Sequence, residues 1–386
     1  MITPSVTQAR WAVAAMFAIH GTVSGSFAAR LPWIADNLNM SEGQLGLALV
    51  MPAIGSLSTM PFAGGIVARF GGRAATRLLI ALWTVALALI PLAPNLLVLM
   101  GILLLAGAAA GTSDMAMNAE GVTVEKRLGR SVMSSLHGMW SVGGLIGGGI
   151  GTAAAYLKIS APVNLAVVSV LLLIFGAFAG RWLLESDPAP AGEKGPRFSF
   201  PRGAVLIIGL IGLCAVFAEV AAADWSAVYL RRVMGEGEGG AAIAYTLFAS
   251  SMAAGRLAGD WIVAKYGAVN TVRVSGAIGV VGGLLVLTKL SSLLVIIGFS
   301  LIGLGVAVVV PLAFSAAGHT GAHPANAIAG VATVSYGAGL AAPGIIGGIA
   351  QLTSLPLSFV LVTALIAVVA LSARRLRGAE LSVHNG

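Results

Sequence analysis

Five side chains in otherwise apolar stretches have the chemistry to bind protons or a polar solute. Asp114 and Asn118 lie one helical turn apart, and His20, His137 and Glu219 each interrupt a long hydrophobic run. An ionisable group inside a membrane-spanning helix costs roughly 2.5–3.5 kcal/mol on insertion scales, so such groups mostly face a polar interior or an ion pathway. We therefore predict that these five residues couple protons or contact a solute.

The alternative for each of these residues is a structural hydrogen bond that ties one helix to its neighbour. Asp114 lies 12 residues before Lys126, roughly 18 Å along a helix, which places it deep in an apolar segment. His20 lies near the middle of the first apolar run. His137 either forms a relay with Asp114 or Asn118, or caps a helix end.

A second group of side chains is expected to line a secondary cavity or an outer gate, and comprises Trp140, Asp224, Trp225 and Tyr336. Asp224 and Trp225 come late in an apolar run and are followed by Tyr229. Because Trp and Tyr concentrate at membrane interfaces, we interpret this stretch as a helix end anchored at the outer surface. Arg256 and Asp260 have i, i+4 spacing and can neutralise one another on one helix.

The elements that position these residues must lie in hydrocarbon. Of the 386 residues, 58% are hydrophobic and only 9% are charged, whereas a soluble domain carries about 25% charged residues. The 52 glycines suit close packing of membrane helices. The net charge of +8 does not indicate nucleic acid, because the basic residues form short clusters between apolar runs. The one cysteine excludes an intramolecular disulfide framework.

Twelve runs are long enough to cross a bilayer, which needs about 20 apolar residues per helix. Charges and Pro, Gly or Asn clusters separate them. The predicted spans are 9–29, 43–68, 74–93, 96–119, 133–155, 162–183, 203–225, 241–264, 271–288, 292–316, 326–350 and 356–373.

The distribution of basic residues predicts the orientation. Most of the 22 Lys and Arg residues, such as Arg69, Arg73 and Lys126, fall in segments on the same side as both termini, whereas Arg30 and Lys158 fall in loops on the other side. The positive-inside rule then places both termini in the cytoplasm. The first run lacks a small-residue cleavage site and continues too long for a signal peptide. We expect a multi-pass protein of a bacterial inner membrane.

A polar stretch rich in Pro, Gly and charge, 185–202, divides the spans into six and six. We predict an N-terminal bundle over 1–184, a cytoplasmic linker over 185–202 and a C-terminal bundle over 203–386.

Two internal matches indicate that the halves are related. The segment Gly64–Arg73 shares Ile-Val-Ala, a basic residue, an aromatic residue and Gly with Asp260–Gly267, at an offset of 196. Trp140–Gly143 matches Val334–Gly337 at an offset of 194. Internal repeats on either side of a central linker are typical of secondary transporters.

The first of these segments also resembles the loop signature of the major facilitator superfamily, Gly-x-x-x-Asp-Arg-x-Gly-x-Arg. Gly64, Arg69, Gly71 and Arg73 match the signature, whereas Ala68 stands where the acid is expected. The resemblance covers essentially the whole chain. It implies the major facilitator fold, an all-α membrane protein with twelve transmembrane helices in two pseudo-symmetric six-helix bundles.

In that superfamily the signature loop and the second-half Gly-Arg-x-x-Gly-Asp pattern pair charges at the cytoplasmic ends of helices and bias the gate. By this resemblance Arg256 and Asp260 join the loop residues as a cytoplasmic gate. The lack of an acid at Ala68 implies a weaker or different pairing in the first half.

A narrower resemblance is to the fucose-permease-like branch and related bacterial permeases. It is carried by residues 114–118 (DMAMN), 136–144 (LHGMWSVGG) and 219–230 (EVAAADWSAVYL). It implies that Asp114 carries the coupled proton. The branch has an aspartate where this chain has Ala28. The resemblance therefore does not extend to the sugar specificity of the branch.

We therefore predict a secondary active transporter that moves a small polar solute by proton-coupled symport and alternating access. Two alternatives are a drug/proton antiporter, which the low aromatic content of 6% disfavours, and a membrane sensor without transport. No nucleophile, metal or nucleotide motif indicates an enzyme or a cofactor. The expected partners are the solute, protons and the lipid bilayer around a monomer, with no nucleic acid.

Overall fold

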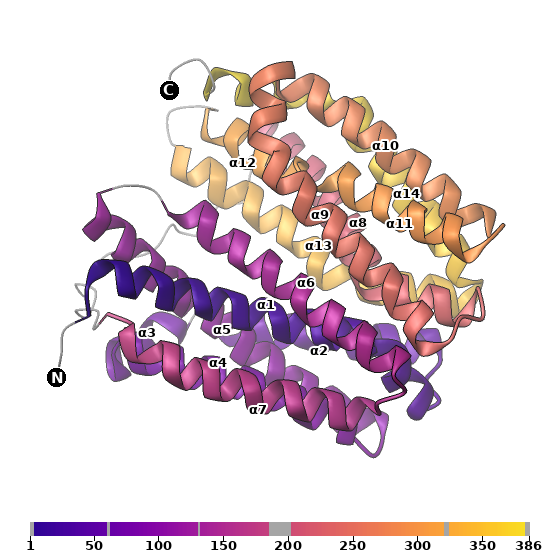
Figure 1. Cartoon of the computed structure of the whole chain (residues 1–386). Helices are drawn as coiled ribbons and strands as arrows, with labels where there is room; N and C mark the ends of the chain where they lie inside the picture. The colour runs from indigo at the N-terminus through magenta and orange to yellow at the C-terminus, as the bar shows by residue number, and fades with distance from the viewer. Residues whose placement is uncertain (1–3, 60–61, 130–131, 185–201, 320–323, 383–386) are drawn as a thin grey trace. The chain divides into compact units, whose positions relative to one another are not determined.

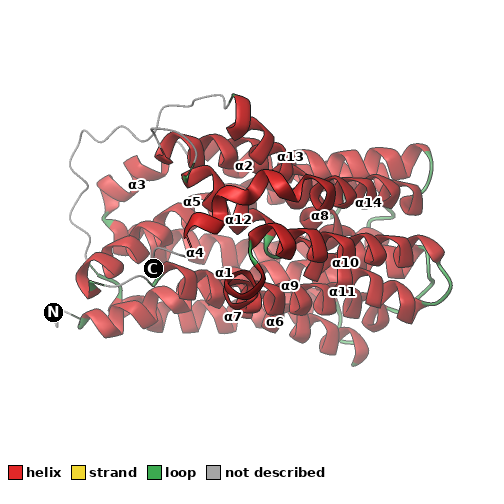
Figure 2. Ribbon diagram, turned by 90° about the horizontal axis from the view of Figure 1, so that it is seen from above, coloured by secondary structure: helices red, strands yellow, loops and turns green. Residues whose placement is uncertain are grey.

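The computed structural model describes residues 4–59, 62–129, 132–184, 202–319 and 324–382, and every regular element in these ranges is helical. Figure 1 labels the helices, and Figure 2 shows that loops are short connections between them. The chain divides into two compact units, one of residues 1–40 with 47–193 and the other of residues 41–46 with 194–386.

The sequence predicts bundles over 1–184 and 203–386 with a linker between them. Nearly all of the predicted linker, 185–201, lies outside the described residues. The short segment Ser41–Gly46 groups with the second unit. Its Glu42 forms an ion pair with Arg232, with 3.1 Å between Glu42 Oε1 and Arg232 Nη1.

The first unit contains seven α-helices among its described residues. Ser5 caps the first of them and Asn95 caps the fifth, each through a side-chain oxygen that accepts a backbone N–H of the first turn. The helices are α1 (Val6–Asn37), α2 (Glu42–Thr59), α3 (Ala63–Phe70), α4 (Gly72–Leu89), α5 (Leu96–Leu128), α6 (Met133–Tyr156) and α7 (Ala161–Ala179).

The second unit also contains seven α-helices among its described residues. Ser291 and Ser354 cap two of them in the same way. The helices are α8 (Gly203–Arg232), α9 (Glu238–Tyr266), α10 (Ala268–Thr288), α11 (Ser292–Val306), α12 (Val309–Gly318), α13 (Pro324–Leu352) and α14 (Leu355–Ser372). A 3₁₀ segment, Ala373–Ser382, follows α14.

These helices supply the twelve spans, with α2 and α3 in the place of one predicted span and α11 and α12 in the place of another. By length and hydropathy alone, nine helical stretches of the described chain qualify as membrane-crossing. Three predicted spans do not meet this criterion: the first is formed by α2 and α3 together, the second by α6 and the third by α9. These helices are shorter, rich in glycine or carry charge. The twelve-helix interpretation agrees with the fold.

The predicted ends of several spans were wrong because helices continue past the apolar run. The first span was expected to end at residue 29, but α1 continues to Asn37 through Arg30 and Pro32. Arg30 is therefore not in an outer loop. Its side chain is only 1% exposed, and its Nη2 donates to the Ile159 carbonyl at 2.7 Å. The fourth and seventh spans likewise extend to Leu128 and Arg232.

The same helix pairs pack within each unit. In the first unit α1 packs against α6, and α4 against α5 and α7; in the second, α8 packs against α13, and α10 against α11 and α14. The second set corresponds, span for span, to the first set six spans later. This internal correspondence agrees with the duplication that the sequence indicates.

Glycines allow α1 and α6 to approach backbone to backbone. A Cβ at Gly21 would overlap the Trp140 carbonyl, and one at Gly143 would overlap the Ala18 carbonyl. Only a residue without a side chain fits such a crossing, as is common between membrane helices. The crossing brings His20 of α1 close to α6.

The strongest structural match between the halves is at two glycines 196 residues apart. Gly71 ends α3 with φ 79° and ψ 147°, and Gly267 ends α9 with φ 78° and ψ 157°. Their N–H groups donate to the carbonyls of Val67 and Val263, which are themselves 196 residues apart. This backbone region is essentially restricted to glycine, so both repeats need Gly here.

Candidate functional site

His20 of α1 lies where this helix meets α4, α5 and α6 in the first unit. It is only 8% exposed, and its Nε2 is 3.2 Å from the Ala110 carbonyl oxygen of α5. The indole Nε1 of Trp140, on α6, donates to His20 Nδ1 at 3.1 Å. The Trp83 ring of α4 lies 5.8 Å from the imidazole.

These two hydrogen bonds determine the tautomer of His20. A carbonyl can only accept, so Nε2 carries the proton, and an indole N–H can only donate, so Nδ1 is an unprotonated acceptor. The geometry therefore selects the neutral imidazole. A proton on Nδ1 would face the indole N–H and break the bond to Trp140.

Asp114 and Asn118 lie on α5, one and two turns beyond the Ala110 carbonyl that His20 contacts. Asn118 Nδ2 donates to the Asp114 carbonyl at 2.8 Å and to the Asp114 carboxylate Oδ1 at 3.2 Å. Both side chains are half-buried, and the Asp114 charge acts on His20. Four predicted candidates, including Trp140, thus form one polar cluster between α1, α5 and α6.

His137 is not part of this hydrogen-bonded cluster. Its Nδ1 lies 3.1 Å from the Met133 carbonyl one turn earlier on α6, and its ring packs on Phe17 at 5.1 Å. The side chain is exposed. The hydrogen bonds of the described residues do not join His137 to Asp114 or Asn118, and the choice between a relay and a helix-end cap stays a prediction.

In the second unit Glu219 of α8 forms an ion pair with Arg256 of α9. Arg256 Nη2 is 2.8 Å from Glu219 Oε1, and the two side chains are 30% and 24% exposed. The sequence suggested that Arg256 and Asp260 neutralise one another within α9. Arg256 binds across to the neighbouring helix. The Asp260 side chain lies outside the described residues, so its pairing with Arg256 stays a prediction.

The interpretation of Trp225 and Tyr229 as interfacial anchors was wrong. Both side chains are fully buried, and the Tyr229 hydroxyl donates to the Val286 carbonyl of α10 at 2.8 Å. The Tyr229 ring packs edge-on against Phe299 and Phe359 at 5.7 and 5.5 Å. Because α8 continues to Arg232, this stretch lies inside the helix rather than at its end.

Asp224 is half-buried on α8, and its charge acts on Tyr245 of α9. Tyr336, predicted beside it, lies in α13, but its side chain is outside the described residues.

The loop motif lies where the sequence predicts, around the junction of α3 and α4. Arg69 is exposed and stacks over Phe70 at 5.5 Å, and the matching Lys265 stacks over Tyr266 at 5.2 Å. Arg73 follows in the first turn of α4. Gly64 belongs to α3, and its surroundings are not described.

Two acidic residues of α5 that were not among the predicted candidates, Glu120 and Glu125, have specific places in the structure. Glu120 is only 1% exposed. It follows Ser113, Ala116 and Met117 at helical spacing on the buried face of α5, a signal that was available in the sequence. Glu125 Oε2 accepts the backbone N–H groups of Val132 and Met133 at 2.8 and 3.2 Å, which fixes the start of α6.

Among the described residues, no group of three or more His, Cys, Asp or Glu side chains is placed to hold a metal ion. The polar clusters are small and separate, and they lie within long apolar helices. Such an arrangement suits proton or solute binding in a membrane protein.

Comparison with known proteins identifies the family. A family model described as Major Facilitator Superfamily matches residues 13–344. The chain belongs to the Major Facilitator Superfamily. This agrees with the twelve-helix fold, the loop signature and the repeated glycine turn.

The chain is similar to two uncharacterised transporters and a further membrane protein along nearly its full length. It is 37% identical over 359 residues to an uncharacterised MFS-type transporter of Yersinia pestis, with 93% of each protein covered. It is 34% identical to an uncharacterised transporter, y4wD, of Sinorhizobium fredii, covering 94% of this chain and 96% of that protein. The membrane protein MosC of Rhizobium meliloti is 30% identical, with 93% and 88% covered.

Solved structures of the superfamily show the same fold at low identity. A mutant of the nucleoside transporter NupG matches with a TM-score of 0.77 at 12% identity, covering 95% of this chain and 99% of that one. The human organic anion transporter MFSD10 matches with a TM-score of 0.65 at 16% identity, covering 96% and 100%. This member of the superfamily is thus a multi-pass membrane protein of a family that transports small molecules.

Proposed function

We propose that this transporter is a proton-coupled symporter that moves a small polar solute by alternating access across a bacterial inner membrane. The observation that carries the proposal is the cluster of Asp114, Asn118, His20 and Trp140 in the first unit. Its four side chains come from three helices, α1, α5 and α6, whose sequences are mostly apolar. Such a cluster is costly in a membrane helix unless it has a function.

Asp114 is better suited than Glu219 to carry the proton. The hydrogen-bonding partner of the Asp114 carboxylate is the neutral amide of Asn118. Glu219 instead has a guanidinium at 2.8 Å, so its carboxylate is already engaged in a strong charge-assisted hydrogen bond. A carboxylate that must load and release a proton needs neighbours that accept both of its states, as an amide does.

His20 and Trp140 are proposed to position the cluster and to sense its charge. The Trp140 indole holds the imidazole neutral through Nδ1, while the Asp114 charge acts on the same ring. Loss of the Asp114 charge on protonation changes the field at His20. The hydrogen bonds that His20 makes to α5 and α6 would then change when Asp114 is protonated.

The substrate is proposed to be small and polar because the cluster offers hydrogen-bonding groups rather than a large aromatic surface. Asn118 presents both a donor and an acceptor in its amide. Energy would come from the proton gradient. Both termini are proposed to face the cytoplasm, on the basis of the charge distribution.

The test is uptake into proteoliposomes that contain a pH-sensitive dye. Sugars, nucleosides, amino acids and organic acids are added one at a time, after a thermal-shift screen has selected those that stabilise the protein. A symporter acidifies the lumen when the solute enters, whereas an antiporter moves protons in the opposite direction.

Asp114→Asn should abolish uptake driven by a pH gradient while leaving solute exchange at equal pH measurable. Glu236→Gln, a carboxylate in the loop between α8 and α9, serves as the matched control and should transport normally. Full gradient-driven uptake in Asp114→Asn would rule out Asp114 as the proton carrier.

A further inference from the structure

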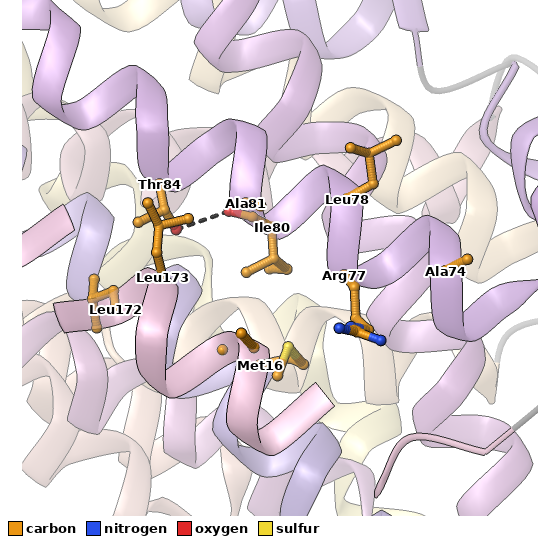
Figure 3. A pocket seen from close by; sticks show the side chains of 11 residues that line it. Met16, Ala74, Arg77, Leu78, Ile80, Ala81, Thr84, Leu172 and Leu173 are labelled. Carbon is orange, nitrogen blue, oxygen red and sulfur yellow. Dashed lines mark hydrogen bonds between the residues drawn. The ribbon is translucent and has the colours of Figure 1, made fainter. Parts of the chain in front are cut away.

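A groove in the first unit lies between α4 and α7, with Met16 of α1 at its base. Its volume is about 510 Å³, and Figure 3 shows its lining, with Leu173 and Ile80 on opposite walls and Arg77 towards one end. At about 30 Å³ per water in the liquid, this is space for roughly 17 waters. The groove is separate from the cluster around His20 and Asp114.

The interior of the groove offers only one polar side chain besides Arg77. Its one hydroxyl, Thr84 Oγ1, donates to the Ile80 carbonyl of its own helix at 2.8 Å. The other lining residues apart from Arg77 are Met, Leu, Ile, Ala and Gly. Water needs two to four polar partners in a cavity, so these walls favour an apolar occupant.

Small residues on both helices create the space. Ala74 and Ala81 are two turns apart on α4, and Gly176 and Ala177 face them from α7. Leucines of the same helices extend outwards: Leu78, at the edge of the groove, is 54% exposed, and Leu171 is 60% exposed. In a membrane protein these exposed apolar side chains meet lipid tails, so the groove is accessible from the hydrocarbon.

Arg77 supplies a positive charge at one end of this apolar groove. The stem of Arg77 lies against Gly180, where a Cβ would come within 2.8 Å of its Cγ. The side chain is exposed, and no carboxylate of the described residues forms an ion pair with it. Arg73, one turn earlier on α4, adds positive charge at the same end of this helix.

We propose that the α4–α7 groove binds one acyl chain of an anionic phospholipid whose phosphate is held by Arg77. A guanidinium matches phosphate oxygens through two parallel hydrogen bonds. Basic sites between transmembrane helices on the cytoplasmic side are suited to anionic headgroups. The walls provide the apolar surface for the chain and Arg77 provides the charge complement for the headgroup.

The experiment is native mass spectrometry of the full-length protein released from mixed micelles with equal amounts of phosphatidylglycerol and phosphatidylcholine. The wild type should retain one phosphatidylglycerol in preference to phosphatidylcholine. Arg77→Gln should reduce this retention about fivefold, as expected for removal of one basic residue near an anionic headgroup. Arg181→Gln, a basic and exposed side chain at the same end that does not line the groove, should change it little.

A second pair of variants tests the acyl-chain part of the site. Ala81→Leu and Ala177→Leu place bulk in the groove and should abolish retention of the lipid. Ala153→Leu, at an exposed position of α6, is the control for the added bulk. Gel filtration of each variant shows whether it remains folded.

Equal retention of the two lipids by the wild type would overturn the proposal. So would equal losses in Arg77→Gln and Arg181→Gln, because they would show a diffuse electrostatic attraction. Unchanged retention in both groove-filling variants would place the lipid elsewhere.

Discussion

The close crossing of α1 and α6 predicts that three identical substitutions on α6 differ sharply in effect. A Cβ at Gly143 would overlap the Ala18 carbonyl, whereas one at Gly144 would meet nothing nearer than 3.8 Å and one at Gly149 nothing within 4 Å. In each case Gly→Ala adds the same methyl group to the same helix. The contribution of helix propensity, about 0.5–1 kcal/mol in favour of Ala, is therefore common to all three.

The difference between the variants isolates the steric cost. Overpacking of a tightly packed interior costs typically 1–3 kcal/mol, and here the obstacle is backbone, which cannot rotate away. Gly143→Ala should therefore have a free energy of unfolding about 1–3 kcal/mol lower than that of Gly149→Ala. Gly144→Ala should be close to Gly149→Ala.

The assay is reversible unfolding of the purified protein by titrating sodium dodecyl sulfate into dodecyl maltoside micelles, followed by circular dichroism. Gly143→Ala also lies one turn from Trp140, so separation of the helices should weaken the bond from the Trp140 indole to His20. A free energy of unfolding for Gly143→Ala equal to that for Gly149→Ala would refute the backbone-contact argument.

Two further outcomes are expected. Gly71→Ala and Gly267→Ala should each destabilise the fold by about 1–3 kcal/mol, because both glycines occupy a backbone region that other residues enter only with strain; similar unfolding curves for either variant and Gly101→Ala, an open helical position, would contradict this. A double-mutant cycle with Glu219→Gln and Arg256→Gln should give a coupling energy of about 0.5–1 kcal/mol, since the ion pair is a quarter exposed and partly screened. Additive effects of the two substitutions on stability would mean that the pair does not hold α8 to α9.

The spans and the duplication could be predicted because their signals are local. Hydropathy and charge reveal apolar runs, and the match at an offset of 196 identified Gly71 and Gly267 before their shared backbone conformation was known. Helix ends could not be predicted as well. Burial of α1 against a neighbouring helix lets it continue beyond the apolar run and shields Arg30. No pattern within the run itself indicates that this neighbouring helix is there.

The candidate site was predicted as a set of residues but not as an arrangement. His20 and Trp140 are 120 residues apart in the chain, and only the crossing of α1 over α6 brings them together. Glu219 and Arg256 meet across two helices in the same way. Trp225 was assigned to the wrong environment because a tryptophan near the end of an apolar run looks the same whether its helix stops or continues.

The long reach of α1 has a consequence for biosynthesis. Arg30 finds its carbonyl partner at Ile159, 129 residues further along the chain. At about 5–20 residues per second of translation, the first helix waits roughly 6–26 s in the membrane before that partner has been made. During this interval Arg30 lacks the Ile159 carbonyl, and for most of it His20 lacks the Trp140 indole that donates to it in the finished protein. The insertion machinery must shelter this helix until α6 emerges, and a chain arrested before residue 159 is expected to become a substrate for membrane proteases.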